Sequence, residues 1–223
     1  MKISVGIPVY DGKVPFQLAL CLLTETSIAH HMGDQLIVRF LPSCTNLAMG
    51  RNQLVKEFLA SDDERLVFVD ADVTFEPGAI IKLSHYPVDF VGGAYRLKQE
   101  TERYPIQLLA EPSGMVDGLV QVASVPTGFL SLSRNVFETF KASHPGRDYQ
   151  VQGHPAYAYF QIPFRDGHLY TEDAFFCREW REKGGQVYLD PEINLTHWQG
   201  NIPYPGHIGN FYRKKMAPTK EAS

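Results

Sequence analysis

Short apolar runs alternate with amphipathic segments along the first third of the chain. The runs at 2–9, 35–41 and 65–69 are rich in Val, Ile, Leu and Phe, and their length is typical of strands. Between them, residues 16–30 and 46–60 carry apolar side chains at helical spacing. The order strand, helix, strand, helix, strand predicts a parallel sheet with right-handed crossovers, which is a Rossmann-like arrangement.

The pattern becomes less regular after residue 75. Strands and helices are still indicated, but they no longer alternate strictly, and this predicts a mixed sheet. The expected elements are a helix at 77–84, strands at 88–95 and 129–132, a hairpin of 106–109 and 119–122 that turns at 112–114, and a helix at 135–142. We find no linker, so we predict one α/β domain over residues 1–205 and a basic tail at 206–223.

A long segment at 143–170 follows, in which glycines and histidines are mixed with aromatic residues. A loop of this length in a compact domain is usually functional, and its aromatic content indicates a binding loop or lid. Residues 171–183 then predict a helix with acidic residues in its first turn, and residues 187–189 predict a last strand.

Composition narrows the functional class. The 223 residues are 44% hydrophobic and 21% charged, which is ordinary for a globular protein with a core. A net charge of −4 gives no general electrostatic reason to bind nucleic acid or an anionic membrane. Three scattered cysteines are too few for a disulfide framework, and no apolar stretch is long enough to span a membrane. We therefore expect a cytoplasmic protein, either free or peripheral to a membrane.

The strongest candidate for chemistry is Asp70-Ala71-Asp72, directly after the strand at 65–69. A buried parallel strand brings its last residues to the carboxyl edge of the sheet, where α/β folds bind ligands. If the chain stays extended, both carboxylates point the same way and repel each other. A divalent cation such as magnesium or manganese would relieve this repulsion. The alternative is a strand end whose solvated acids begin a turn.

Further motifs follow in a fixed order: Ile7-Pro8-Val9-Tyr10, Gly50-Arg51-Asn52, Pro126-Thr127-Gly128, Thr171-Glu172-Asp173 and His197. Together with Asp70-Ala71-Asp72, this series resembles the GT-A glycosyltransferases, and among them glycosyltransferase family 2. The resemblance extends from about residue 3 to about residue 197. It implies a GT-A fold and the inverting transfer of a sugar from a nucleoside-diphosphate-sugar donor to a hydroxyl of a glycan, lipid-linked or protein acceptor.

The resemblance also assigns a metal site and a catalytic base. Asp72 would be the main carboxylate ligand, Asp70 would lie nearer the ribose or the water shell of the metal, and His197 would complete the site. An imidazole ligand favours manganese over magnesium. Asp173 would be the base that takes the proton of the acceptor hydroxyl, and Glu172 would assist it or hold the acceptor. Without the other motifs, the two acids would simply suit a helix N-terminus, and His197 would be an ordinary structural histidine.

The same resemblance assigns positions around the donor and acceptor. Arg51 and Asn52 would lie near the nucleotide, and Arg51 could bind a phosphate with two nitrogens, although a helical arginine is more often solvated. The remaining nucleotide-binding positions would be Pro8, Val9, Tyr10, Asp70 and Ala71, while Gly92, Gly93, Thr127 and Gly128 would let the donor sugar and acceptor approach the backbone. The alternative for these glycines is tight strand packing.

The chain also departs from parts of the family pattern. It lacks the Gln-x-x-Arg-Trp motif and membrane helices of processive synthases, which favours transfer of a single sugar. Residues 41–44 lack the acidic residue that many relatives use to read uracil, so the base stays open. Three alternatives also stay open: a haloacid dehalogenase-like phosphatase with Asp70 as nucleophile and Asp72 as acid/base, a non-catalytic sugar-nucleotide-binding module, and a nucleotidyltransferase.

Overall fold

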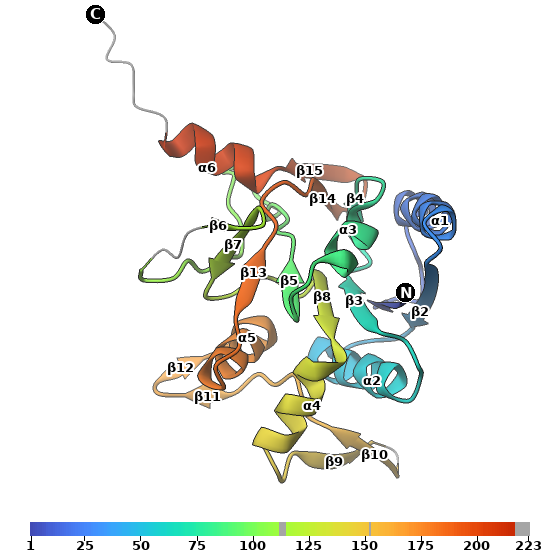
Figure 1. Cartoon of the computed structure of the whole chain (residues 1–223), viewed down its shortest axis with the longest axis vertical. Coiled ribbons are helices and arrows are strands. Elements are labelled where there is room, and N and C mark those ends of the chain that lie inside the picture. The colour runs from blue at the N-terminus through green and yellow to red at the C-terminus, as the bar shows by residue number, and fades with distance from the viewer. Residues whose placement is uncertain (112–114, 152, 217–223) are drawn as a thin grey trace, which may run out of the picture.

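The fold is built on one eight-stranded mixed sheet (Figure 1), seen in a computed structural model that describes residues 1–111, 115–151 and 153–216. The strands of this sheet follow the order β2-β1-β3-β8-β5-β13-β7-β6. Their bounds are β1 Lys2–Pro8, β2 Gln35–Leu41, β3 Arg65–Val69, β5 Phe90–Gly92, β6 Met115–Val116, β7 Leu119–Val122, β8 Phe129–Ser133 and β13 Val187–Leu189.

The predicted division of the sheet is confirmed. β1 pairs in parallel with both β2 and β3, as the strand–helix–strand pattern requires. Beyond β3 the sheet becomes mixed, because β8 is antiparallel to both of its neighbours, β3 and β5. The α/β fold class follows, with a parallel N-terminal half and a mixed C-terminal half.

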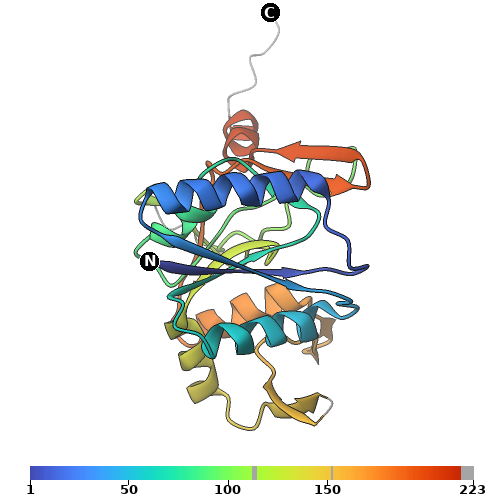
Figure 2. The same cartoon turned by 90° about the vertical axis from the view of Figure 1, so that its right-hand side faces the viewer.

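Helices cover both faces of the sheet (Figure 2). α1 and α3 pack on one face, and α2, α4 and α5 pack on the other. The helix bounds are α1 Phe16–His31, α2 Leu47–Leu59, α3 Ala79–His85, α4 Arg134–Ser143, α5 Glu172–Glu182 and α6 Ile208–Met216. Successive side chains of β3 point to opposite faces, so Leu66 and Phe68 pack toward α2 while Val67 and Val69 pack toward α1.

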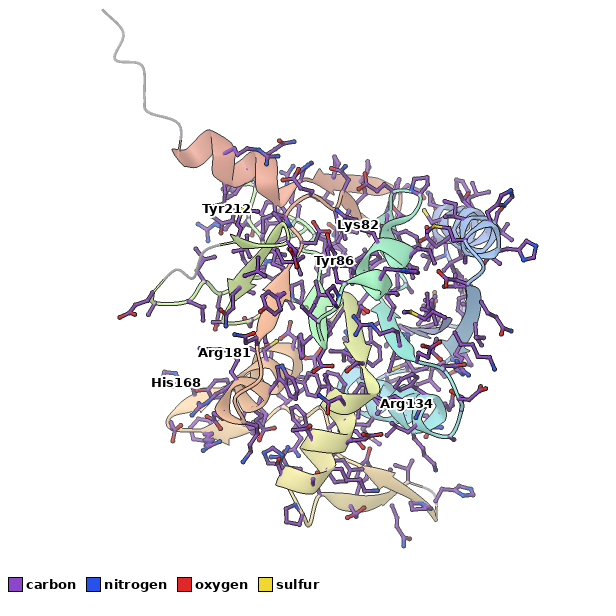
Figure 3. The ribbon with its side chains drawn as sticks, viewed as in Figure 1. Lys82, Tyr86, Arg134, His168, Arg181 and Tyr212 are labelled. Atoms are coloured by element: carbon purple, nitrogen blue, oxygen red, sulfur yellow. The ribbon has the colours of Figure 1, made fainter. Side chains whose placement is uncertain are left out.

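Polar contacts at the ends of elements fix their positions. Asn46 caps α2 by accepting a hydrogen bond from the backbone N–H of Met49 at 3.0 Å. Lys82 and Tyr86, labelled in Figure 3, come from α3 and the residue that follows it, and both contact Asp190 Oδ2, at 2.7 and 2.9 Å. These contacts tie α3 to the chain that leaves β13.

A second sheet has the strand order β15-β14-β4, and its strand β4 begins shortly after the end of β3. Its strands are β4 Val73–Phe75, β14 Leu195–Gln199 and β15 Ile202–Gly206. Antiparallel pairing places His197 of β14 opposite Val73 of β4. The C-terminal part of the chain is thereby brought back to the residues that follow β3.

The predicted hairpin at 106–122 is wrong in its first strand. Residues 119–122 form β7, but the partner of β7 is β6 at 115–116, and Gln107 contributes only an isolated bridge to Ser124. The chain turns at Asp117-Gly118, where both residues have positive φ, as Asp-Gly turns of two-residue hairpins do. The predicted turn at 112–114 lies outside the described residues.

The segment at 143–170 is not one long loop. It forms two small hairpins, one of β9 Asp148–Val151 with β10 His154–Tyr157, the other of β11 Phe164–Arg165 with β12 His168–Leu169. Its central aromatic residues are buried in the core on the α2 side, namely Tyr157, Tyr159 and Phe160. The prediction of a binding loop or lid was wrong for these residues, because their aromatic surface packs inward.

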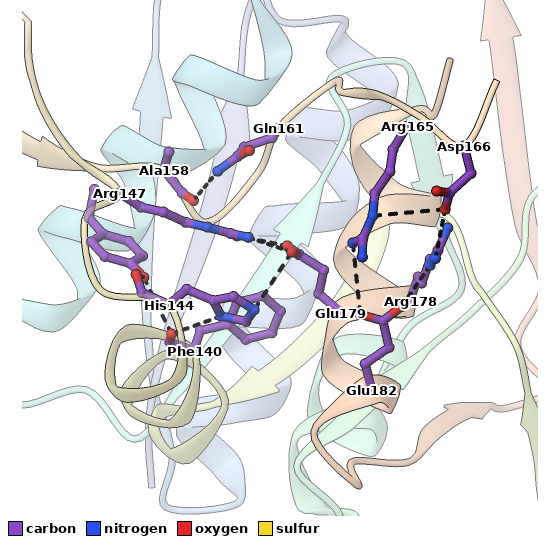
Figure 4. A network of polar contacts seen from close by, with 11 residues as sticks. Phe140, His144, Arg147, Ala158, Gln161, Arg165, Asp166, Arg178, Glu179 and Glu182 are labelled. Atoms are coloured by element: carbon purple, nitrogen blue, oxygen red, sulfur yellow. Dashed lines mark hydrogen bonds and ion pairs between the residues drawn. The ribbon is translucent and has the colours of Figure 1, made fainter. Parts of the chain in front are cut away.

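Buried charge anchors the same segment to α5. Arg147, just before β9, binds both carboxylate oxygens of Glu179, which is 2% exposed, and His144 approaches the same carboxylate at 3.6 Å (Figure 4). Bidentate arginine–carboxylate pairs fix geometry as well as charge. The hairpin of β9 and β10 is thus connected to the helix that carries Glu172 and Asp173.

Two further findings concern the C-terminal residues and the search for a membrane-spanning helix. In the range 206–223, expected as a basic tail, Gly206 ends β15 and residues 208–216 form α6, whose first residue Ile208 is buried in the core. Within the residues that the structure describes, we find no helix with the length and apolar character needed to cross a membrane.

Candidate active site

The two aspartates after β3 do not continue the strand. The backbone N–H of Val73 donates to the carbonyl of Asp70 at 3.0 Å, so residues 70–73 form a tight turn. The prediction that both carboxylates point the same way in an extended chain was therefore wrong. The turn lets the two carboxylates find different partners, Arg51 for Asp70, and Lys98 with His197 for Asp72.

Asp72 and His197 lie next to each other at the start of β4, where β4 pairs with β14. His197 Nε2 lies 3.6 Å from Asp72 Oδ1, and the backbone N–H of Trp198 donates to the Asp72 carbonyl at 2.8 Å. The other ring nitrogen of His197, Nδ1, is 3.1 Å from the carbonyl of Arg96. Because a carbonyl only accepts, Nδ1 carries the proton, and Nε2 presents its lone pair toward Asp72 unless the ring is charged. Backbone contacts of this kind orient the imidazoles of metal sites.

Arg51 is a buried cation beneath the carboxylates. It is 1% exposed, its Nη2 donates to Asp70 Oδ1 at 3.0 Å, and its Nε lies 3.7 Å from Glu172 Oε1. The guanidinium also stands over the Phe68 ring at 5.5 Å. The alternative of a solvated helical arginine is thus excluded, and Arg51 joins the end of β3 to the start of α5.

Gly128 leaves the space that Asp70 needs. The backbone N–H of Asp70 donates to the Gly128 carbonyl at 3.0 Å. A Cβ at Gly128 would lie 2.7 Å from the ring of Tyr95 and closer still to Asp70 Oδ2. Here the predicted glycine has a clear steric reason, because only glycine lets β8 approach both side chains.

Tyr95 stands between the acidic groups, and sequence reasoning missed it. Its ring packs against the His197 ring with centroids 4.6 Å apart. Burial raises the pKa of Tyr95 well above its usual value, the negative charges of Asp70, Asp173 and Asp72 raise this pKa further, and Arg51 opposes them. The Tyr95 ring therefore lies next to His197 and, like Asp70, close to Gly128.

The two acids of α5 differ in their surroundings. Burial raises the pKa of Glu172, the nearby Arg51 lowers it, and the charge of Asp173 raises it again. Asp173 Oδ1 accepts hydrogen bonds from the Thr171 hydroxyl and from the backbone N–H of Ala174. Both hydrogen bonds are to the same oxygen, and the second oxygen, Oδ2, accepts none from the described residues.

The remaining predicted nucleotide positions divide into exposed and internal ones. Tyr10 is 74% exposed at the end of β1, whereas Pro8 and Val9 are buried and Ala71 is half-buried. Asn52 is also internal, because its amide nitrogen donates to the Phe160 carbonyl at 3.1 Å and its oxygen accepts from the Phe160 N–H at 2.8 Å. Asn52 therefore holds the segment after β10, with both its amide nitrogen and its amide oxygen hydrogen-bonded to the backbone of Phe160.

The predicted donor-sugar and acceptor positions are also tightly packed. A Cβ at Gly93 would meet Leu195 at 3.1 Å and Phe129 at 3.2 Å, and one at Gly92 would meet the Phe129 carbonyl at 3.1 Å. Thr127 is 1% exposed. Strand packing, the alternative considered for the glycines, explains Gly92 and Gly93.

Lys98 is a second residue that sequence reasoning missed. Its ammonium lies 2.5 Å from Asp72 Oδ2, on the side of the carboxylate that His197 does not face. Its loop is folded on itself, because Arg96 Nη2 donates to the carbonyls of Gln99 and Glu100. A single lysine a few residues after Gly92-Gly93 does not by itself indicate a site residue. The role of Lys98 becomes visible only in the structure, where its loop lies against Asp72 and His197.

The donor set fits a divalent metal that shares its ligands with a substrate. No cluster of three or more His, Cys, Asp and Glu side chains suited to a metal occurs among the residues that the structure describes. Asp72 and His197 supply one carboxylate and one imidazole with its lone pair oriented. Magnesium-type ions are often held by one or two protein ligands plus phosphates, and an imidazole suits manganese. The pair fits such an ion when a diphosphate supplies further oxygens.

Comparison with known structures identifies the fold as GT-A. Protein A197 from STIV superimposes with a TM-score of 0.58 at 18% identity, covering 89% of this chain and 86% of that chain. A mutant Drosophila beta1,4-galactosyltransferase 7, solved with manganese, UDP-Gal and xylobiose, superimposes with a TM-score of 0.50 at 16% identity, covering 96% and 73%. The predicted fold is confirmed. No protein-family model matches the sequence, and no curated protein sequence matches it.

Proposed function

We propose that this protein is a metal-dependent, inverting glycosyltransferase that moves a single sugar from a nucleoside-diphosphate donor to an acceptor hydroxyl. The GT-A fold supports nucleotide-sugar transfer in general. The observation that carries the finer proposal is that the buried Arg51 lies 3.0 Å from Asp70, after β3, and 3.7 Å from Glu172, at the start of α5. Through Arg51, the acidic motif after β3 and the acidic motif of α5 come to one site.

Asp72 and His197 are the residues that would hold manganese or magnesium. When bound, the metal neutralises the negative charge that develops on the departing diphosphate. The Arg96 carbonyl keeps the proton of His197 on Nδ1, so that Nε2 stays free to act as a ligand. Asp70, bound to Arg51, keeps the end of β3 in place.

Asp173 would act as the general base. Its Oδ1 accepts from Thr171 and from the N–H of Ala174, which fixes the carboxylate, and Oδ2 would take the proton of an incoming hydroxyl. Glu172 is the less suitable base, because its carboxylate lies against the buried Arg51. It would hold the helix start in register with Asp70 and position the acceptor.

The test is the product released from the donor. The protein is incubated with nucleoside-diphosphate sugars, manganese and a panel of sugar acceptors, and nucleoside diphosphate, pyrophosphate and inorganic phosphate are measured separately. We expect nucleoside diphosphate, and Asp173→Asn should lower its release by about 10²–10⁴-fold while donor binding is kept. Asp62→Asn, which changes an exposed aspartate paired only with Lys2, is the matched control and should have no effect.

Each alternative has its own result. Pyrophosphate release would indicate nucleotidyl transfer, and phosphate release from simple esters, lost in Asp70→Asn, would indicate the phosphatase mechanism. Donor binding without any turnover would indicate a binding module. Full activity of Asp173→Asn would refute its role as the base.

A further inference from the structure

Lys98 occupies one side of the carboxylate that would bind the metal. Its ammonium is 2.5 Å from Asp72 Oδ2, while His197 Nε2 is 3.6 Å from Oδ1. Asp72 therefore has a cation on one oxygen and a potential metal ligand near the other. A lysine ammonium is a compact point charge, and it neutralises a carboxylate much as a metal ion does.

The ammonium is placed there by an organised loop. Arg96 donates its Nη2 to two carbonyls of the same loop, those of Gln99 and Glu100, and Leu97 donates its N–H to Arg103 at 2.8 Å. The Arg96 carbonyl in turn accepts a hydrogen bond from the Nδ1–H of His197. One short loop thus orients the imidazole and delivers a positive charge to the neighbouring carboxylate.

A divalent cation and this ammonium compete for the same charge. A metal bound to a carboxylate oxygen lies about 2.0–2.2 Å from it, and two cations that close to one small group repel each other strongly. Lys98 is 28% exposed on a long flexible side chain, so its ammonium can move aside into solvent without unfolding the loop.

We propose that Lys98 is a resident cation of the Asp72 site, which the divalent metal must displace in order to bind. This inference rests on the metal site of the proposed function. In the absence of metal, Lys98 holds the Asp72 carboxylate in place and offsets its repulsion of the other acids. Displacement makes metal binding weaker than Asp72 and His197 alone would allow, so the metal is retained mainly when a diphosphate adds its own oxygens.

The first test measures manganese binding without any donor, by the electron paramagnetic resonance signal of free Mn²⁺. Lys98→Met should tighten binding by about threefold to tenfold, because a partly exposed ion pair no longer has to be broken. Lys98→Arg keeps a cation and should stay near wild type. Lys82→Met removes the same charge from the pair with Asp190 and controls for the change in net charge.

The second test follows the lysine itself in the unaltered protein. Acetylation by a water-soluble reagent is measured by mass spectrometry at each lysine, with and without manganese at constant pH. Manganese should raise the labelling rate of Lys98 about twofold or more and leave that of Lys82 unchanged. This readout needs no variant to fold and no enzymatic activity.

The outcomes separate this inference from the proposed function. If Asp72→Asn abolishes manganese binding but Lys98→Met leaves the affinity unchanged, or manganese leaves Lys98 labelling unchanged, Lys98 is no competitor and the metal site stands. If neither wild type nor Lys98→Met binds manganese saturably, even when a nucleoside diphosphate is present, the metal site itself is refuted together with this inference.

Discussion

Gly128→Ala tests the close packing at the centre of the site. The new methyl group would lie 2.7 Å from the Tyr95 ring and closer still to Asp70 Oδ2. Asp70 cannot move away cheaply, because its carboxylate is bound to Arg51, which is 1% exposed. We therefore expect the backbone of β8 or the turn at 70–73 to shift, with loss of the Asp70–Arg51 contact.

The expected magnitude follows from these contacts. Insertion of a methyl group into a tightly packed interior costs about 1–3 kcal/mol. For a protein of this length each kcal/mol lowers the melting temperature by about 2–4 °C, so Gly128→Ala should melt about 2–12 °C below wild type. The affinity for a nucleoside diphosphate with manganese should fall as well, because Asp70 is displaced.

The matched control separates instability from damage to the site. Gly118 has a φ of +80° in the turn between β6 and β7, and a Cβ there meets no atom within 4 Å. Gly118→Ala should therefore cost about 1–2 kcal/mol through backbone strain alone and leave diphosphate affinity unchanged. Differential scanning fluorimetry and calorimetric titration measure the two quantities. A Gly128→Ala protein with wild-type melting temperature and affinity would refute the packing argument.

Three further predictions concern charge, hydrogen bonding and pH. Arg51→Met should lower the free energy of unfolding, measured in urea, by about 3–5 kcal/mol, because Asp70 and Glu172 lose their buried cation. A decrease below about 1 kcal/mol would contradict this prediction. Asn52→Ala should lower the free energy of unfolding by about 2–4 kcal/mol, because the N–H and the carbonyl of Phe160 both lose their partner. Nucleotide affinity should stay unchanged, and a loss of affinity without a loss of stability would show that Asn52 is a ligand. Burial opposes ionisation of Asp72, but hydrogen bonds from the charged form of His197, in which Nε2 also carries a proton, and from Lys98 outweigh it and lower the pKa of Asp72 to about 2. The stabilising contribution of Asp72 is therefore complete above about pH 4 and is lost as the pH falls toward 2. The stability difference between wild type and Asp72→Asn, measured by urea unfolding from pH 2 to 6, should follow that course, and a constant difference would contradict the assignment.

The parallel half of the sheet could be predicted because its signals are local. β1, β2 and β3 are short runs of apolar residues, and amphipathic helices separate them, so period and length alone identify them. The motif at 171–173 was also placed correctly, at the start of α5. The prediction that 187–189 is the last strand was wrong, because β14, which contains His197, and β15 follow it.

The turn at 70–73 could not be predicted, because distant partners select it. Arg51 comes from α2 and His197 from β14, and each attracts a different carboxylate. Nothing within the Asp-x-Asp tripeptide distinguishes this turn from an extended end of β3. Tyr95 and Lys98 were missed for a similar reason, because their partners, His197 and Asp72, lie far from them in the sequence.

The hairpin of β6 and β7 was missed although its signal is local. Asp117-Gly118 is a strong sequence for a two-residue turn, but residues 112–114 offered a competing proline–glycine turn. The same dipeptide, at Asp166-Gly167, marks the turn of β11 and β12. An Asp-Gly pair at 166–167 therefore indicates the hairpin of β11 and β12, whereas the hairpin of β9 and β10 has no such pair at its turn.

The central claim is a donor site that needs both a divalent metal and Asp72. The most direct measurement is the melting temperature of the protein with each nucleoside diphosphate, with and without manganese, for wild type and for Asp72→Asn. A ligand that binds only the folded state raises the melting temperature by mass action. We predict a rise with one diphosphate that requires manganese, disappears with a chelator and is absent in Asp72→Asn. No rise with any diphosphate, or a rise that Asp72→Asn retains, would contradict the account.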